Sequence, residues 1–516
     1  MNPAEWLART ARRRPGATAL MRGLAKVSDY QGFARNAAAL AAAMQQRLGV
    51  EPGDRVALFM PNRTEYLEIL YGIWFAGAVA VPINAKLHPR EVSWIIENSE
   101  AAVAFSDRAL GPALGGVAPS SLGALIEVDG ADYASLLRAE PMAAPHPMDA
   151  DDIAWLFYTS GTTGRPKGVM ITARNLQAMA LTYFVDVDSV HAGDAALYAA
   201  PISHGAGLYN FMHVMAGARH VVPESGGFEP GEIAGAAPVL GDVSMFAAPT
   251  MVRRLLDHAQ RSDWSGEGLR TVVYGGGPMY VADIVEAVET MGPRFVQIYG
   301  QGESPMTITA LSRDQVSDRS HPRWRERLAS VGMAQSCVRV MVVDADGAAL
   351  PPGEAGEILV KGDPVMRGYW RNAEATAETL EEGWLWTGDV GAMDEDGFLT
   401  LHDRSKDVII SAGANIYPRE VEEVLLTHAS VREAAVVGAP HPEWGEEVVA
   451  FVVTRDDTPP DASALDAHCL ARIARFKRPR RYLAISELPK NNYGKVVKVA
   501  LRERLGDADG RADRAR

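Results

Sequence analysis

The sequence predicts an α/β fold: a large N-terminal domain with parallel sheets flanked by helices plus a β subdomain, then a small α+β C-terminal domain. Strands alternate with helices along the first half of the chain, as in α/β layers. From about Val338 the pattern changes to short alternating strands with tight turns. After Asp403 a separate segment begins. We therefore expect one domain at residues 1–403 and a second at 404–516.

Apolar spacing predicts the first elements. Residues 31–48 carry apolar side chains on one helical face. Thr64 is expected to cap the next helix, and Pro89 suits the first turn of another. We expect loops at 107–121 and 140–150, and strands at 55–60, 79–83, 102–105 and 153–158.

The strand at 153–158 runs into the stretch Y-T-S-G-T-T-G-R-P-K-G-V, which begins at Tyr158. It offers backbone N–H groups, hydroxyls and the cation Lys167, the donors that a polyphosphate needs. A flexible linker would need neither the cation nor the flanking apolar strands. Lys167 is followed by Gly168, so the stretch is not a Walker A loop. The candidate phosphate ligands are Thr159, Ser160, Gly161, Thr162, Thr163, Gly164 and Lys167.

Three further predicted strands also end in unusual loops. The strand at 195–199 precedes His204, the strand at 271–274 precedes Gly275, and the strand at 295–299 precedes Gly300. Ligands of open α/β sheets bind beyond the carboxyl ends of strands. These loops are therefore placed to converge on one site.

Composition excludes several classes of function. The net charge of −14 over 516 residues argues against nucleic acid as the main partner. Two cysteines cannot build a disulfide framework, which is compatible with a cytoplasmic protein. The N-terminus lacks the apolar region of a signal peptide, and no stretch approaches the roughly 20 apolar residues of a membrane span. The oligomeric state is open, and a homodimer is compatible with the sequence.

The phosphate stretch resembles the signature of the adenylate-forming enzymes, which include acyl-CoA synthetases, aryl-CoA ligases, luciferases and peptide-synthetase adenylation domains. Further motifs follow in family order over nearly the whole chain: G-G-G-P at 275–278, Q-I-Y-G-Q-G-E at 297–303, W-T-G-D at 386–389, D-R-S-K at 403–406 and G-K at 494–495. The resemblance implies that ATP or AMP is bound by Gly275, Gly276, Gly277, Tyr299, Gly300, Gln301, Gly302, Asp389 and Arg404, with Mg²⁺ on Glu303 and Thr159. Asp389 and Arg404 would hold the ribose.

This chain departs from the family pattern at two motifs. Gly302 stands where a threonine usually donates to the α-phosphate, so that contact is lost or replaced, for instance by Ser304. Tyr493 precedes the Gly-Lys pair, where Ser or Thr is more frequent. Lys490 and Lys498 lie nearby, and the Gly-Lys match selects Lys495 as the catalytic lysine.

The resemblance implies an acid–thiol ligase that uses ATP, Mg²⁺ and coenzyme A. The acid would become an acyl-AMP and then an acyl-CoA, with release of pyrophosphate and AMP. Between the two steps the C-terminal domain would swing on a hinge at Lys406 and present residues 411–413 to CoA, namely Ser411, Ala412 and Gly413. His204 would orient the acyl group in a pocket lined by Gly205, Ala206, Ser304, Pro305 and Met306.

Small residues such as Gly205 and Ala206 in the predicted acyl pocket leave room for a large acyl group. The expected substrate is therefore a medium- or long-chain fatty acid or an aryl acid. One alternative is an acyl-AMP ligase that loads a carrier-protein thiol, and another is a non-catalytic nucleotide sensor. The basic run at 475–481 would attract CoA phosphates or form a solvated face. The charged tail at 506–516 is expected to be disordered.

Overall fold

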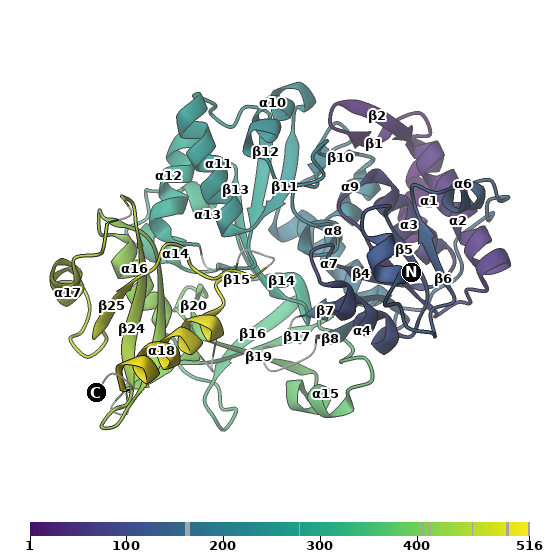
Figure 1. The fold of residues 1–516 in the computed structure, drawn as a ribbon. Coiled ribbons are helices and arrows are strands. Elements are labelled where there is room, and N and C mark those ends of the chain that lie inside the picture. The colour runs from purple at the N-terminus through teal and green to yellow at the C-terminus, as the bar shows by residue number, and fades with distance from the viewer. Residues whose placement is uncertain are drawn as a thin grey trace. The chain divides into compact units, whose positions relative to one another are not determined.

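The computed structural model describes residues 1–159, 166–277, 279–404, 407–411, 414–456, 458–491 and 495–513, with backbone alone at 403, 404 and 506–513. The predicted α/β class is confirmed, since helices alternate with largely parallel strands (Figure 1). The chain divides into two compact units. Unit 1 comprises Met1–Pro278, Glu286–Val340 and Val360–Trp386, and unit 2 comprises Met279–Val285, Met341–Leu359 and Thr387–Arg516. The expected boundary at 403/404 stays a prediction.

The larger sheet of unit 1 has nine strands. Its central strands, from β9 to β13, are parallel, so their carboxyl ends share one edge. Its spatial order is β15 (Met333–Ala334), β14 (Ser304–Leu311), β13 (Phe295–Gln301), β12 (Leu269–Tyr274), β11 (Val243–Ala247), β9 (Ala195–Leu197), β10 (Arg219–Val222), β1 (Thr18–Arg22), β2 (Ala25–Asp29).

The second sheet of unit 1 has six strands. Five are parallel and almost wholly apolar, as expected for strands buried on both faces. The sixth runs antiparallel to its neighbour and forms one edge of the sheet. The order is β6 (Ala124–Glu127), β5 (Ala101–Ser106), β3 (Arg55–Phe59), β4 (Val79–Ile83), β7 (Ile153–Thr159), β8 (Lys167–Thr172).

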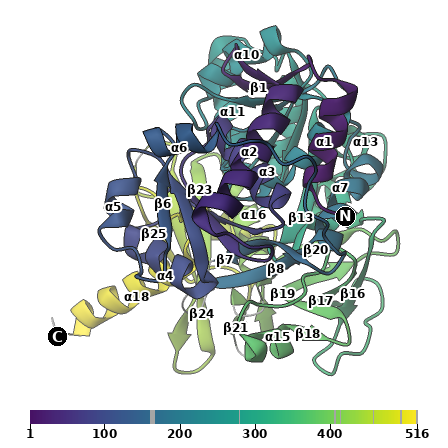
Figure 2. The same ribbon diagram turned by 90° about the vertical axis from the view of Figure 1, so that its right-hand side faces the viewer.

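Helices cover these sheets, and none among the described residues is long and apolar enough to cross a membrane. The alanine-rich α2 packs against α3, seen side by side in Figure 2, and at Gly72 an added Cβ would lie 3.0 Å from the Leu40 Cβ. The helices that begin before residue 380 are α1 (Ala4–Arg13), α2 (Tyr30–Leu48), α3 (Thr64–Phe75), α4 (Pro89–Ser99), α5 (Gly111–Gly115), α6 (Ala131–Leu136), α7 (Ala173–Asp186), α8 (Gly205–Leu208), α9 (Asn210–Ala216), α10 (Pro230–Leu240), α11 (Pro249–Ser262), α12 (Val281–Met291), α13 (Arg313–Ser317), α14 (Trp324–Ala329), α15 (Ala373–Thr379).

Three expectations about local structure are wrong. Thr64 does not cap α3: it is the first helical residue, Arg63 takes the cap position, and the Thr64 hydroxyl donates to Glu65 Oε2 over 3.2 Å. The expected loop at 107–121 contains α5. The tail expected to be disordered is helical over 506–513, where it continues α18 (Lys498–Asp513).

A third sheet forms the predicted β subdomain. Three of its strands, β16, β17 and β19, each contain one of the points at which the chain passes from one unit to the other. Its order is β16 (Val338–Val343), β17 (Ala355–Gly362), β19 (Trp384–Met393), β18 (Leu380–Glu381), with β20 (Leu399–Arg404) antiparallel to β19.

The last part of unit 2 is a sheet covered on both faces. Along β23, Val436 faces one apolar cluster and Val437 the other. Side chains of α16 and α17 fill the first cluster, and Leu501 and Leu505 of α18 fill the second. The elements are β22 (Ala414–Ile416), β21 (Ile409–Ser411), β24 (Gly445–Thr454), β23 (Val431–His441) and β25 (Arg481–Ala484), with α16 (Pro418–Leu426), α17 (Ala462–Leu470) and α18.

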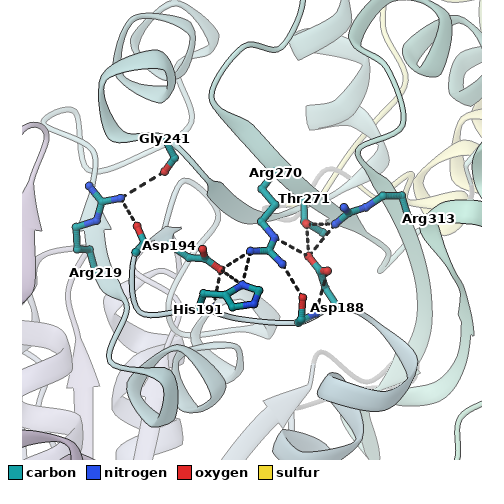
Figure 3. A network of polar contacts seen from close by, with 10 residues as sticks. Asp188, His191, Asp194, Arg219, Gly241, Arg270, Thr271 and Arg313 are labelled. Atoms are coloured by element: carbon teal, nitrogen blue, oxygen red, sulfur yellow. Dashed lines mark hydrogen bonds and ion pairs between the residues drawn. The ribbon is translucent and has the colours of Figure 1, made fainter. Parts of the chain in front are cut away.

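Charged side chains tie together the amino-terminal edge of the nine-stranded sheet (Figure 3). Arg270 Nη1 lies 2.9 Å from Asp194 Oδ2, and Arg313 Nη2 lies 2.8 Å from Asp188 Oδ2. Asp194 is 3% exposed, so removing its partner would leave a buried charge. These contacts hold the loop before β9 against the start of β12, at the edge away from the glycine-rich loops.

Candidate active site

The phosphate stretch of unit 1 is a β-hairpin. Thr159 at the end of β7 and Lys167 at the start of β8 are paired across the ladder, so they flank the loop between them. The Lys167 Nζ lies 4.9 Å from the centroid of the Tyr369 ring, within cation–π range. The remaining candidate phosphate ligands lie outside the described residues: Ser160, Gly161, Thr162, Thr163 and Gly164.

Glu303 lies on the turn between β13 and β14 and contacts the same tyrosine. Its Oε1 accepts a hydrogen bond of 2.6 Å from the Tyr369 hydroxyl, and its carbonyl accepts one of 2.8 Å from Met366 N. Tyr369 itself is bridged to Val169 of β8. One aromatic ring therefore brings the predicted phosphate cation, Lys167, together with the predicted metal ligand.

Sequence reasoning missed Tyr369. It follows β17, in the stretch Gly368-Tyr369-Trp370, where the sequence shows neither a periodic pattern nor a turn signal for a ligand. Its partner Glu303 is 66 residues away along the chain. Only the tertiary contact distinguishes this side chain from an ordinary core aromatic.

Gly302 packs against the end of β7. A Cβ added there would lie 2.5 Å from Thr159 Cγ2 and 3.1 Å from Phe157 Cδ1. The position therefore has no room for the usual threonine side chain unless Thr159 moves. Ser304, the suggested replacement, is fully buried, and its hydroxyl lies 3.4 Å from Thr307 Oγ1 within β14. Glycine is thus the residue that lets the two motifs touch.

The predicted adenine segment also contains a glycine that packs closely against a neighbouring strand. Gly275 follows β12, and a Cβ there would lie 2.5 Å from the Ile298 carbonyl of β13. Gly276 has φ of +79°, which glycine adopts without strain. Tyr299 is 7% exposed on β13. The predicted adenine contacts Gly275, Gly276, Gly277, Tyr299, Gly300 and Gln301 therefore lie on adjacent strand ends.

His204 lies beside the phosphate hairpin, at the start of α8. Its ring meets Phe157 of β7 edge-on, with centroids 5.2 Å apart, and its Nδ1 lies 3.0 Å from Ser203 Oγ. A Cβ added at Gly205 would lie 3.0 Å from Met306 Sδ. Ala206 and Pro305, the other predicted acyl contacts near it, are buried. The predicted acyl residues are thus brought together next to the phosphate hairpin.

Unit 2 pairs the two predicted ribose ligands. Asp389 and Arg404 are direct Cα partners across the antiparallel strands β19 and β20. Asp389 is 7% exposed, and its N–H donates to Thr387 Oγ1 over 3.1 Å. Burial, and to a lesser extent the charge of Asp389, raises the pKa of the neighbouring Glu357.

Lys495 is exposed, and its N–H donates to Asn491 Oδ1 over 3.0 Å. The two other lysines of the motif form ion pairs, Lys490 with Glu433 and Lys498 Nζ with Glu422 Oε1 at 3.5 Å. Of the other predicted functional residues of unit 2, Ser411 ends β21 opposite Ala414, and Lys406, Ala412 and Gly413 lie outside the described residues.

The basic run at 475–481 is engaged in ion pairs. Lys477 Nζ lies 2.8 Å from Glu420, Arg478 Nη1 2.6 Å from Asp466, and Arg481 Nε 3.0 Å from Glu447. Carboxylates thus balance three of its cations, which favours a structural face over a site for CoA phosphates.

The described residues contain no group of three or more His, Cys, Asp or Glu side chains that could hold a metal ion. Mg²⁺ does not need such a cage, since one or two carboxylates and substrate phosphates suffice. Glu303, beside the phosphate hairpin, fits that mode of binding.

Comparison with known proteins places the chain in a family. The sequence model of the AMP-binding enzymes matches residues 7–370, and that of their C-terminal domain matches residues 420–495. The chain therefore belongs to the AMP-binding enzyme family.

Curated relatives and solved structures resemble it over nearly their full length. A feruloyl-CoA synthase of Amycolatopsis sp is 36% identical over 97% of this chain and 98% of the relative. A fatty acid–[acyl-carrier-protein] ligase of Streptomyces coeruleorubidus is 36% identical over 89% of this chain and 88% of its own. The o-succinylbenzoate CoA synthetase of Bacillus subtilis, solved with its acyl-adenylate intermediate, has a TM-score of 0.84, 30% identity and 97% coverage of both chains.

Proposed function

We propose that this chain is an acid–thiol ligase that converts a fatty or aryl carboxylic acid into its acyl-CoA through an acyl-AMP. The contact of Tyr369 with both Glu303 and Lys167 carries the proposal, because it joins a carboxylate and a cation at the end of the phosphate hairpin. Membership of the AMP-binding enzyme family supports the reaction class.

The first half-reaction needs no general base, because a carboxylic acid is already ionised at neutral pH. Its oxygen attacks the α-phosphorus of ATP, the bond to the β-phosphate oxygen breaks, and pyrophosphate leaves. The protein must screen negative charge and align the reactants. We assign Lys167 and the hairpin to the phosphates, Asp389 and Arg404 to the ribose, and Lys495 to the carboxylate and α-phosphate.

Mg²⁺ is part of this proposal, with Glu303 and Thr159 as the residues that would hold it. When bound, the ion would neutralise charge on the phosphate oxygens. The Tyr369 hydroxyl donates to Glu303 Oε1 and so orients the carboxylate without consuming its second oxygen.

In the second half-reaction a thiol loses its proton and attacks the acyl carbonyl, and the bond from the acyl carbon to the AMP oxygen breaks. We assign the hinge to Lys406 and the CoA-facing loop to Ser411, Ala412 and Gly413. Lys495 would leave the site before this step. A second candidate acceptor is a carrier-protein thiol, since one relative is named as such a ligase.

The direct experiment measures pyrophosphate release over a panel of fatty, cinnamic, benzoic and dicarboxylic acids, with and without CoA. We expect acid-dependent pyrophosphate and a CoA-dependent thioester, detected by mass spectrometry. Acyl transfer to a carrier protein but not to CoA would favour the second candidate. ATP binding without pyrophosphate release for any acid would favour a nucleotide sensor.

We also propose that the protein acts in the cytoplasm, where ATP and CoA are available. Its two cysteines, Cys337 and Cys469, are both free thiols. A homodimer remains a prediction that analytical ultracentrifugation would test.

A further inference from the structure

A small cavity lies inside unit 1, between α8, α9 and β11. It encloses about 10 Å³, room for about one water-sized group. Six of the residues that line it are Tyr183, Ala206, Tyr209, His213, Ser244 and Phe246. Ala206, Tyr209 and His213 are spaced three and four residues apart, so the consecutive short helices present them on one side.

Two buried polar atoms of this lining are unsatisfied. Neither the Tyr209 hydroxyl nor the His213 Nε2 has a hydrogen-bond partner among the described residues. The two side chains are 6% and 2% exposed. Leaving a buried polar atom unpaired costs roughly 1–3 kcal/mol, so a partner other than the described residues would stabilise both atoms.

The hydrogen bond of its other ring nitrogen determines the role of His213 Nε2. His213 Nδ1 lies 2.8 Å from the Tyr209 carbonyl, which can only accept, so the ring proton is on Nδ1 and Nε2 is an acceptor. Burial lowers the pKa of His213 and keeps the ring neutral. Burial raises the pKa of Tyr209, so its hydroxyl keeps its proton and is able to donate. A hydroxyl group, which accepts from Tyr209 and donates to His213 Nε2, satisfies both atoms.

This cavity shares part of its wall with the predicted acyl pocket. Phe246 lines the cavity and also lies 3.7 Å from a Cβ added at Gly205, next to Met306. Ala206 lines it as well, two residues after His204. The walls are aromatic, with the Tyr183 and Tyr209 rings 4.9 Å apart and Phe246 edge-on to Tyr209. Because of this shared wall, we infer that the far end of an acid bound at His204 lies beside Tyr209.

We propose that the cavity is a subsite for a hydroxyl on the ring of an aryl acid, which accepts from Tyr209 and donates to His213. The inference rests on the proposed function, because it assumes that the acyl group enters along Gly205 and Ala206. It selects hydroxylated aryl acids over aliphatic and unsubstituted aryl acids as the substrate class. A permanently trapped water molecule is the alternative occupant.

The test compares cinnamic acid with its 2-, 3- and 4-hydroxy derivatives, and with the fluoro analogue of the best isomer, in the CoA-dependent pyrophosphate assay. Fluorine resembles a hydroxyl in size but cannot donate. For one isomer we expect kcat/KM at least tenfold above both cinnamic acid and the fluoro analogue. Equal use of all these acids by the wild type would overturn the proposal and leave a trapped water as the occupant.

Tyr209→Phe removes the donor without changing the ring and should reduce the hydroxyl preference about tenfold, with activity toward cinnamic acid retained. Tyr66→Phe is the matched control: this hydroxyl is also buried without a partner among the described residues, and it does not line the cavity. A preference that survives Tyr209→Phe, or is lost equally in Tyr66→Phe, would contradict the subsite.

The wild-type comparison remains decisive even where Tyr209→Phe does not fold. Decanoic acid, which has no ring, distinguishes a failure of the subsite from a failure of the proposed function. Pyrophosphate from decanoic or cinnamic acid without a hydroxyl preference refutes only the subsite. No pyrophosphate from any acid refutes the proposed function itself.

Discussion

The Tyr369 hydroxyl donates to Glu303 Oε1 over 2.6 Å, while Lys167 lies 4.9 Å from the centre of the same ring. A hydrogen bond to a charged acceptor contributes roughly 1.5–3 kcal/mol. The tyrosine therefore fixes the direction of the carboxylate that we assign to Mg²⁺, at the edge of the phosphate hairpin.

Tyr369→Phe should lower kcat/KM for MgATP about tenfold or more and raise the Mg²⁺ concentration needed for half-maximal rate, because Glu303 loses its orienting donor. The measurement is pyrophosphate release over a Mg²⁺ titration. Tyr133→Phe is the control, since its hydroxyl also donates to a carboxylate, Glu68, over 3.4 Å. An unchanged Mg²⁺ requirement with reduced thermal stability would assign Tyr369 a structural role only.

Gly302→Ala should reduce acyl-AMP formation by tenfold or more, because the new Cβ would collide with Thr159 Cγ2. Thr159→Ser removes that methyl and keeps the hydroxyl. The double variant should therefore be more active than Gly302→Ala alone, as measured by acid-dependent pyrophosphate release. Additive losses would show that the two residues do not compete for the same space.

Lys495→Ala should abolish acyl-AMP formation from acid and ATP and largely spare thioester formation from supplied acyl-AMP. The reason is that the lysine is assigned to the first half-reaction alone. The two half-reactions are assayed separately. Lys490→Ala is the control, because Lys490 is engaged with Glu433. Equal loss of both half-reactions in Lys495→Ala would refute the assignment.

We expect the buried carboxyl of Glu68 to make the folding stability of unit 1 depend on pH. Burial raises its pKa to about 7, while bonds from Asn36 and Tyr133 act in the opposite direction. Because the folded pKa exceeds the unfolded value, the stability it contributes is fully present below about pH 4.5 and is lost as pH rises through about 7. Glu68→Gln should therefore stabilise unit 1 at pH 8.5, by on the order of 3 kcal/mol, and hardly at all at pH 4.5.

Thermal unfolding of the wild type and Glu68→Gln at both pH values provides the measurement. Glu97→Gln is the control, since Glu97 is exposed on α4. A gain of the same size at both pH values would mean that the carboxyl does not titrate in this range.

The periodicity of apolar residues predicts several of the helices and strands correctly. The apolar run at 79–83 and the helix over 31–48 lie where the periodicity places them, because their own side chains fill the core. The short helix α5 is not predicted, since its sequence of glycine, proline and alanine resembles a loop. The tail at 506–513 has the composition of a disordered segment and is nevertheless helical.

The candidate site was predictable where one motif supplies its residues, as at Thr159 and Lys167. It was not predictable where distant segments meet. The Tyr369–Glu303 bond and the fit of Gly302 against Thr159 depend on how β17, the β13–β14 turn and β7 pack. The unsatisfied pair Tyr209 and His213 likewise becomes visible only once burial is known.

The central claim is that this chain joins a carboxylic acid to coenzyme A through an adenylate. The most direct measurement quantifies the products of a reaction containing acid, ATP and CoA. We expect AMP, pyrophosphate and acyl-CoA in equal amounts, and acyl-AMP when CoA is omitted. Formation of ADP and phosphate, or AMP formation that does not depend on the acid, would contradict it.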